Sequence, residues 1–253
     1  MKIGLIYPQT ELGGDPVAVR EIGLAAEALG FDHLLAYDHV LGATHDREPK
    51  LNGPYTEKQP FHDPLVMFGY LSAITRRIGF ATGVLILPQR QTALVARQAA
   101  DVALLSDDRL RLGVGLGWNY VEYEALGQDF ASRGKRVSEQ VELLRKLWSE
   151  PLVDFTGAFD RVDRAADAFA QAARLRDLLD QEGRAKQGFG LQCNMLKAKS
   201  PEQVVETALR WREAGGTHAA FATMGQGMET RGQHLGYIES VADALRKEGM
   251  LEG

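Results

Sequence analysis

Residues 109–119 read RLRLGVGLGWN, and this stretch decides the fold. It begins as an apolar strand, places three glycines two residues apart, and ends in Trp118 and Asn119. Glycine permits close approach of the backbone to a ligand, Trp offers a flat face, and Asn offers hydrogen-bond donors and acceptors. A dinucleotide-binding loop requires G-x-G-x-x-G, and Trp118 stands at the sixth position. The pattern therefore excludes that loop and indicates a strand whose end lines a ligand pocket.

Short apolar runs alternate with helical patterns on both sides of this stretch. Strands are predicted over residues 3–7, 33–37, 78–87 and 109–115, and helices over 16–29, 64–76, 92–105 and 133–148. Asp15 precedes the first helix as an N-cap, and Gly30 follows that helix as its stop. Asp63-Pro64 opens the second helix, with Pro at its first helical position. Because the strands are apolar almost throughout, the alternation indicates a parallel sheet with helices on its faces.

The rhythm changes after Pro151. We expect a hairpin over 152–162, one helix over 164–183, and then strand, helix, strand and helix over 189–194, 201–214, 217–223 and 233–247. This gives six parallel strands, not eight, although the chain of 253 residues has the length of a TIM-type barrel, which typically takes about 250. The sequence therefore predicts an α/β fold, a shortened TIM-type (β/α) barrel, as a single domain over residues 1–253.

The composition is that of an ordinary soluble globular protein, with 45% hydrophobic and 25% charged residues. The net charge of -5 gives no indication of a nucleic-acid or membrane partner. The chain starts MKIGLIYP, without the charged and long apolar regions of a signal peptide, and it has no apolar run of about 20 residues. We therefore expect a cytoplasmic protein.

Two kinds of catalytic site find no support in the sequence. The single cysteine, Cys193, rules out an internal disulfide and a multi-cysteine zinc site, and we expect it to be a packed thiol. No set of His, Asp and Glu residues has metal-ligand spacing, so no metal site is predicted. The absence of G-x-S-x-G leaves serine hydrolase chemistry unsupported.

Several short motifs follow one another in a particular order along these alternating strands and helices. Tyr37-Asp38-His39-Val40 follows the second strand, residues 82–90 read TGVLILPQR, and residues 95–100 read VARQAA. GVGLGWN at 113–119 is followed by Glu122-Tyr123 and Arg133-Gly134, and GGTH at 215–218 and TMG at 223–225 fit as well. Together they resemble the bacterial luciferase-like family, in particular its deazaflavin-dependent oxidoreductase branch, over residues 1 to about 165 and 187 to 245.

The resemblance implies a (β/α)8 barrel that binds a flavin or coenzyme F420 at the carboxyl ends of its strands. It implies hydride transfer between F420 and a small organic substrate, with an FMN-dependent monooxygenase as the alternative. His39 would be the catalytic group that orients substrate or exchanges a proton. The cofactor-binding positions would be Asp38, Gly83, Val84, Gly115, Gly117, Trp118 and Asn119.

Each of these positions also has a structural interpretation. Asp38 either orients the His39 ring or caps the following turn. Gly83-Val84 is an ordinary bulge, or the cis peptide that family members often have against the cofactor ring. Trp118 is a core aromatic or a pocket wall, and Asn119 is a helix cap or a cofactor contact.

The chain departs from the family after the hairpin. The family carries there a strand ending in Gly-Gly, a helix and another strand, which help to hold the cofactor phosphate. Here strands five and six and the helix between them are missing, since residues 163–166 lead almost directly into the next helix. Arg90 or Arg97 would have to replace the phosphate anchor, or both are structural. A third possibility is a degenerate barrel that acts as a ligand-binding or structural protein.

Two further expectations follow from this reading. The loop over residues 41–62, with three prolines and two glycines, is predicted to be an active-site lid that sets substrate choice. A gapped barrel exposes strand edges, so we expect a homodimer with the 164–183 helix at or near the interface.

Overall fold

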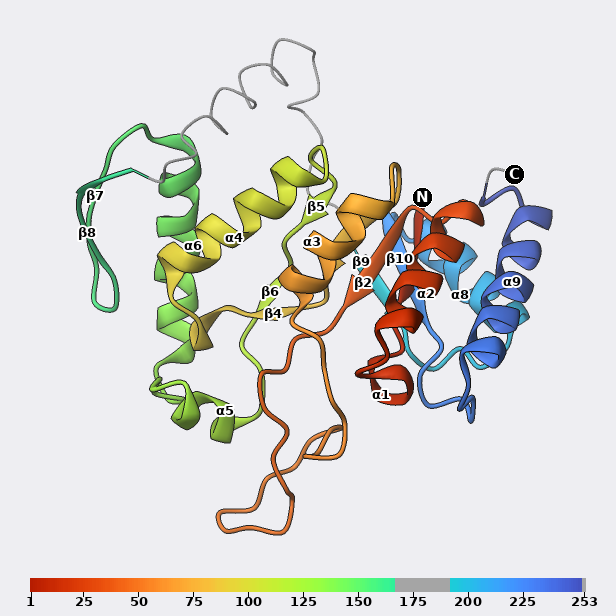
Figure 1. Ribbon diagram of the computed structural model, residues 1–253, viewed down its shortest axis with the longest axis horizontal. Coiled ribbons are helices and arrows are strands. Elements are labelled where there is room, and N and C mark those ends of the chain that lie inside the picture. Colours follow the sequence, from red (N-terminus) through yellow and green to blue (C-terminus); the bar gives the residue numbers. More distant parts are fainter. Residues whose placement is uncertain (167–191, 252–253) are drawn as a thin grey trace.

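The computed structural model describes residues 1–166 and 192–251. Its main sheet has six strands, all parallel, in the order β5-β3-β2-β1-β10-β9 (Figure 1). These strands are β1 (Lys2–Ile6), β2 (His33–Ala36), β3 (Gly79–Thr82), β5 (Leu110–Arg111), β9 (Gln192–Met195) and β10 (His218–Ala222). Within the described residues β5 and β9 are the two edges of this sheet. The predicted α/β fold with six parallel strands is confirmed, as a half-barrel.

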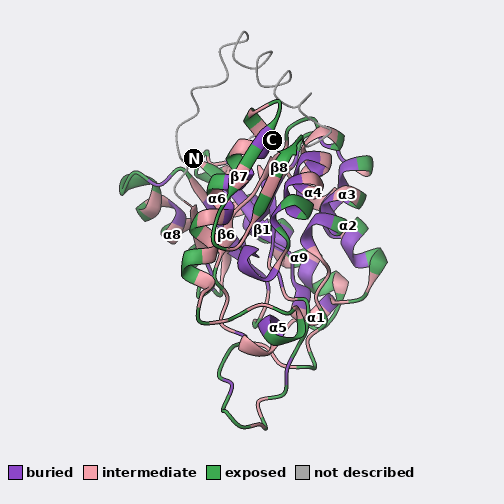
Figure 2. Cartoon of the chain, turned by 90° about the vertical axis from the view of Figure 1, so that its left-hand side faces the viewer, coloured by how far each residue is buried: buried purple, intermediate pink, exposed green. Residues whose placement is uncertain are grey.

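Helices cover the outer face of the half-barrel and form the main core with it. They are α2 (Pro16–Ala28), α3 (Pro64–Ile74), α4 (Thr92–Leu105), α8 (Pro201–Glu213) and α9 (Arg231–Lys247). Helix α6 (Arg133–Ser149) packs on α4 and belongs to a second apolar cluster. Figure 2 shows buried residues on the faces of α2, α3, α4 and α9. The predicted starts of α2 and α3 are confirmed: the Asp15 and Asp63 carboxylates each accept two N–H bonds there. Gly30 ends α2 with a φ of 86°.

The two strands predicted over 78–87 and 109–115 are each broken in the middle. After β3 and β5 the chain continues as β4 (Leu85–Ile86) and β6 (Val114–Gly115), which pair only with each other. At the break the Thr82 hydroxyl donates to the Gly113 carbonyl over 2.7 Å. Strand β4 leads into the short 3-10 helix η1 (Leu87–Gln89). This break lies at the carboxyl end of the sheet, where the candidate site is built.

The predicted hairpin is confirmed as the antiparallel pair β7 (Val153–Thr156) and β8 (Arg161–Ala165). Strand β8 is almost wholly exposed (Figure 2). The helix predicted over 164–183 is wrong at its start, because Val153 pairs with Ala165 and extends the strand. The remainder of that prediction, from residue 167, lies outside the described residues. Two short helices were not predicted as elements, α1 (Gln9–Leu12) and α5 (Tyr120–Ala125).

The inner face of the half-barrel carries small and medium apolar side chains. A separate cluster of Ile6, Leu35, Ala81, Ala220 and Ala222 lies there, away from the main core. Cys193 on β9 packs instead against the main core as a half-buried free thiol, as predicted, and burial raises its pKa. No helix in the described part of the chain has the length and apolar character needed to cross a bilayer.

Candidate functional site

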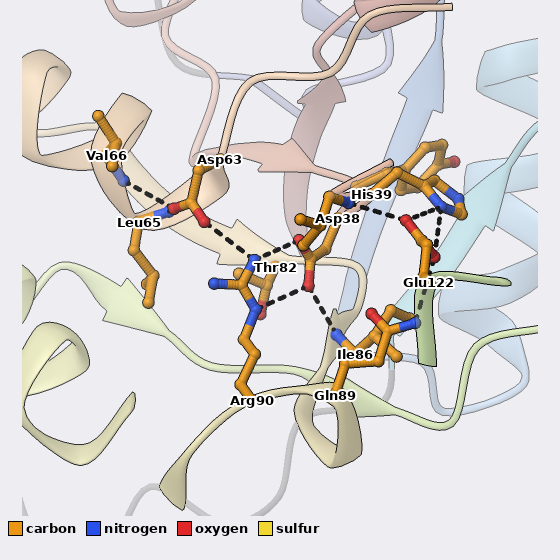
Figure 3. A network of polar contacts seen from close by, with 12 residues as sticks. Asp38, His39, Asp63, Leu65, Val66, Thr82, Ile86, Gln89, Arg90 and Glu122 are labelled. Atoms are coloured by element: carbon orange, nitrogen blue, oxygen red, sulfur yellow. Dashed lines mark hydrogen bonds and ion pairs between the residues drawn. The ribbon is translucent and has the colours of Figure 1, made fainter. Parts of the chain in front are cut away.

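The Glu122 carboxylate is the centre of a polar network at the carboxyl end of the sheet (Figure 3). Its two oxygens lie 3.2 and 3.3 Å from Nδ1 of His39, which follows β2. It also accepts the backbone N–H groups of Val40 and Leu41 over 2.8 and 3.0 Å, and the Gln89 amide over 3.2 Å. Glu122 therefore fixes both the His39 ring and the chain that enters the long loop after it.

The charge of Glu122 determines which nitrogen of His39 carries a proton. Its side chain is 1% exposed, and this burial raises its pKa. The hydrogen bond and charge of His39 and the N–H of Leu41 outweigh burial and hold the pKa of Glu122 below its ordinary value. A carboxylate only accepts hydrogen bonds, so Nδ1 of His39 must donate. Nε2 has no hydrogen-bond partner among the described residues and is left to exchange a proton or bind a ligand.

Aromatic rings surround the imidazole of His39. The ring centroids of Tyr55, Phe61 and Trp118 lie 5.2, 5.0 and 5.5 Å from that of His39, each in edge-on geometry. Tyr55 and Phe61 come from the loop over residues 41–62, which contains no helix or strand and extends from the lower side of Figure 1. Gly53 of the same loop lies so close to the Trp118 ring that a Cβ there would overlap it. The loop thus packs directly on His39, and its action as a lid stays a prediction.

Asp38, the residue before His39, belongs to a buried ion-pair network. Its carboxylate accepts the Ile86 N–H over 2.9 Å and pairs with Arg90 over 2.6 Å, and Arg90 also pairs with Asp63 over 2.9 Å (Figure 3). Burial raises the pKa of Asp38 even with Arg90 beside it. Arg90 therefore has a structural role, which was the alternative to binding the cofactor phosphate. Asp38 binds η1 and β4 rather than the His39 ring or the following turn, and its contact with a cofactor stays a prediction.

Asn119 acts as the N-cap of α5. Its Oδ1 accepts the Val121 N–H over 3.1 Å, and its Nδ2 donates to the Leu41 carbonyl over 3.2 Å. The structural interpretation of this residue is thus confirmed, and its contact with a cofactor stays a prediction. Trp118 is half-buried and lines the wall around His39.

The glycines of the opening stretch allow two chain segments to approach each other. A Cβ on Gly115 would overlap the Val84 side chain, and one on Gly83 would overlap Leu35. Gly117 has a φ of 66°, and a Cβ there would lie 2.9 Å from Ile86. The peptide bond between Gly83 and Val84 is cis, which is the interpretation that the family resemblance offered instead of an ordinary bulge. These contacts leave Val84 37% exposed at the carboxyl end, as an apolar surface near the predicted pocket.

The sequence reasoning missed Glu122 and Gln89 as site residues. Glu122 stands three residues after the cap Asn119, where a Glu is typical of a capping box and therefore looks structural. Its contact with His39 joins residues 83 apart in the chain. The one available signal was its place in the family motif. Within the described residues no group of three or more His, Cys, Asp or Glu side chains is placed to hold a metal ion.

The model of a known protein family, described as luciferase-like monooxygenase, matches residues 4–176. The chain belongs to this family. An uncharacterized protein of Mycobacterium tuberculosis is 36% identical over 140 residues, covering 53% of this chain and 49% of the relative. The chain thus spans about half the length of that relative.

Two further comparisons involve proteins with named cofactors. An F420-dependent glucose-6-phosphate dehydrogenase of Tsukamurella paurometabola is 29% identical over 232 residues, covering 85% of this chain and 65% of the relative. The crystal structure of a riboflavin lyase with modified FMN aligns over 100% of this chain and 92% of its own, with a TM-score of 0.70 and 15% identity. That second likeness shows the fold alone. One relative is thus named as F420-dependent, and a protein of the same fold was crystallised with modified FMN.

Proposed function

We propose that this protein is an oxidoreductase that binds coenzyme F420 at the carboxyl end of the half-barrel and transfers a hydride between it and a small organic substrate. The observation that carries this proposal is the His39–Glu122 pair, in which Nδ1 is held by a buried carboxylate and Nε2 has no partner among the described residues. The likeness to an F420-dependent dehydrogenase supports the choice of cofactor.

The residues at this end of the sheet fit the ring of such a cofactor. Val84 presents an exposed apolar surface, and the buried hydroxyl of Tyr37, which precedes Asp38, has no hydrogen-bond partner in the part of the chain that the structure describes. An apolar wall with a few unsatisfied polar groups is typical of a cofactor pocket. The phosphate of such a cofactor does not have Arg90 as a free anchor, because the Arg90 guanidinium is already shared between Asp38 and Asp63.

When bound, F420 supplies the carbon that accepts or releases the hydride. The protein's own contribution is to position and to move protons. Glu122 keeps the proton of His39 on Nδ1, so Nε2 takes or gives the proton that accompanies the change at the substrate. Tyr55, Phe61 and Trp118 limit access of water to this nitrogen and hold the ring edge-on.

Two other functions remain as alternatives, each with its own support. The likeness in fold to an FMN-containing lyase favours an FMN-dependent monooxygenase. The engagement of Arg90 in ion pairs favours a degenerate barrel that binds a ligand without catalysis.

A fluorescence titration of the full chain with F420, beside one with FMN, tests the proposal. Micromolar binding of F420, with FMN at least about tenfold weaker, is the expected result. Tighter binding of FMN would replace the proposal by the monooxygenase. If neither bound, the degenerate barrel would be the better account.

A further inference from the structure

A polar layer lies at the amino end of the half-barrel, opposite the site around His39. It consists of His33, Arg111, Gln192 and His218, which come from β2, β5, β9 and β10. His33 and His218 each stand two residues before a member of the inner apolar cluster, Leu35 and Ala220. Since side chains alternate along a strand, both point to the inner face of the half-barrel. We call these four residues the amino-end layer.

His33 is the most deeply buried member of the layer, at 4% exposure. Its neighbours in the sheet are Gly4 and Gly79, and a Cβ on Gly4 would overlap the imidazole. The two flanking positions thus leave room for this ring. Among the described residues neither ring nitrogen has a partner in hydrogen-bonding geometry, although the nearby Gln192 side chain acts to raise the pKa of His33 against the stronger effect of burial. Buried polar atoms in folded proteins almost always have a partner, so these two nitrogens are available to bind a ligand.

Arg111 brings a positive charge to the same layer. Its Nη2 donates to Oε1 of Gln192, which links the two edge strands of the sheet. Within the described residues this is its one hydrogen bond, and it forms no ion pair there. A guanidinium has five N–H donors, so four remain unused. Burial lowers the pKa of Arg111, as expected for a charge that has no counter-ion.

His33, Arg111 and His218 line a pocket of about 280 Å³. Lys2 and Asp32 at its rim pair with each other over 2.8 Å, so their charges offset. Arg109 also lines it, but its guanidinium donates to the hydroxyl of Thr75 and to backbone carbonyls such as that of Ile78. Asp108 is the remaining acidic side chain on the wall. Arg109 and Arg111 both lack an ion pair in the described structure, and Arg111 is the one whose N–H donors are largely unused.

We propose that this pocket binds one small oxyanion, of the phosphate or carboxylate class, through the Arg111 guanidinium and the imidazoles of His33 and His218. Arginine matches such oxygens with two parallel hydrogen bonds. Burial, and then the charge of Arg111, lower the pKa of both histidines, which favours their neutral form. Nδ1 of His218 lies 2.8 Å from the Thr217 hydroxyl, so Nε2 is the nitrogen of His218 that is available to the anion. The pocket is too small for a nucleotide and lies at the opposite end of the strands from His39, so the site is independent of the proposed cofactor chemistry.

Calorimetric titration of the full chain with inorganic phosphate tests this site. We expect one phosphate per chain and an affinity at least about tenfold weaker in Arg111→Met. Arg210→Met makes the same change on an exposed position of α8 and should leave binding within about twofold of the wild type. Acetate that displaces phosphate extends the site to carboxylates, and acetate without effect restricts it to phosphate-type anions.

A second variant guards against a fold defect in Arg111→Met. Arg111→Lys keeps the charge but loses the paired donors, and it should bind phosphate with intermediate affinity. In NMR spectra of the wild type, phosphate should shift the imidazole signals of His33 and His218 and not that of His39. Wild-type protein that gives no binding heat with phosphate, or an Arg111→Lys variant that binds as tightly as the wild type, would overturn the proposal.

Discussion

At the scale of single residues, Glu122 joins three parts of the chain. It binds the ring of His39, the backbone N–H groups of Val40 and Leu41 at the start of the long loop, and Gln89 of η1. Hydrogen bonds to a buried charged group contribute more to stability than neutral ones. The same carboxylate also determines which nitrogen of His39 is available, so its replacement should have a structural and a chemical effect.

Glu122→Gln should destabilise the protein by about 2 kcal/mol at neutral pH, because its neutral amide accepts these N–H groups more weakly. The folded pKa of Glu122 is lowered, so its stabilisation is present above the unfolded pKa of about 4.3 and is lost as the pH falls through the folded pKa. The difference in urea unfolding between variant and wild type should therefore shrink below about pH 4. Glu124→Gln, an exposed neighbour, is the control and should show little change at either pH. A pH-independent difference for Glu122→Gln would contradict this role.

The second effect of Glu122→Gln concerns the tautomer of His39. In the wild type a neutral His39 ring should carry its proton on Nδ1, facing the carboxylate. A glutamine amide can donate to Nδ1, which would allow the proton to move to Nε2. Nitrogen-15 NMR of the histidine side chains distinguishes the two tautomers. The same tautomer in both proteins would show that Glu122 does not control this proton.

Residue roles were predictable from the sequence only where their partners are close in the chain. Asp15 and Asp63 cap helices through N–H groups two and three residues ahead, and the local pattern was sufficient to find these two helix starts. Asp38 and Glu122 bind groups 33 to 83 residues away, which no local pattern reveals. The family resemblance supplied His39, but the carboxylate that orients it emerged only from the fold.

At the scale of elements, the glycine-rich segment 113–117 and the segment 82–86 pack together more closely than side chains would allow. This approach breaks both long strands into β3 with β4 and β5 with β6. From the sequence, these glycines indicate space for a ligand. The sequence alone does not show that another segment of the same chain occupies that space. In the structure they first accommodate Thr82, Val84 and Ile86.

Gly117→Ala should destabilise the protein by about 2 kcal/mol, because a positive φ and a contact with Ile86 both oppose a Cβ. Gly127→Ala is a matched control: its φ of 68° is almost the same, but nothing lies within 4 Å of the added carbon. It should cost only about 1 kcal/mol. Thermal unfolding of the two variants separates the contact from the backbone effect. Equal losses would mean that the approach of the two segments is not tight.

At the scale of the whole molecule, the fold is a six-stranded half-barrel with two sheet edges in the described residues, β5 and β9. The alternation of apolar runs and capped helices was enough to predict this, since each unit is defined by nearby residues. The helix expected to begin at residue 164 was placed incorrectly because strand pairing with Val153 overrides a local helical pattern.

We propose that the protein forms a homodimer, because strand edges that have no partner strand in the described residues, together with exposed apolar side chains, favour association. Light scattering at micromolar concentration should give twice the chain mass of 27.8 kDa. A monodisperse species of single-chain mass would contradict this expectation.

The central claim is that a cofactor ring binds at the carboxyl end of the half-barrel, beside Val84. Val84→Phe places a bulky side chain on that surface, whereas Val66→Phe makes the same change on the 69% exposed face of α3. Fluorescence titration of both variants and the wild type with F420 is the most direct measurement. The account predicts at least about tenfold weaker binding for Val84→Phe and unchanged binding for Val66→Phe. Unchanged affinity in Val84→Phe, with wild-type protein that binds F420, would contradict it.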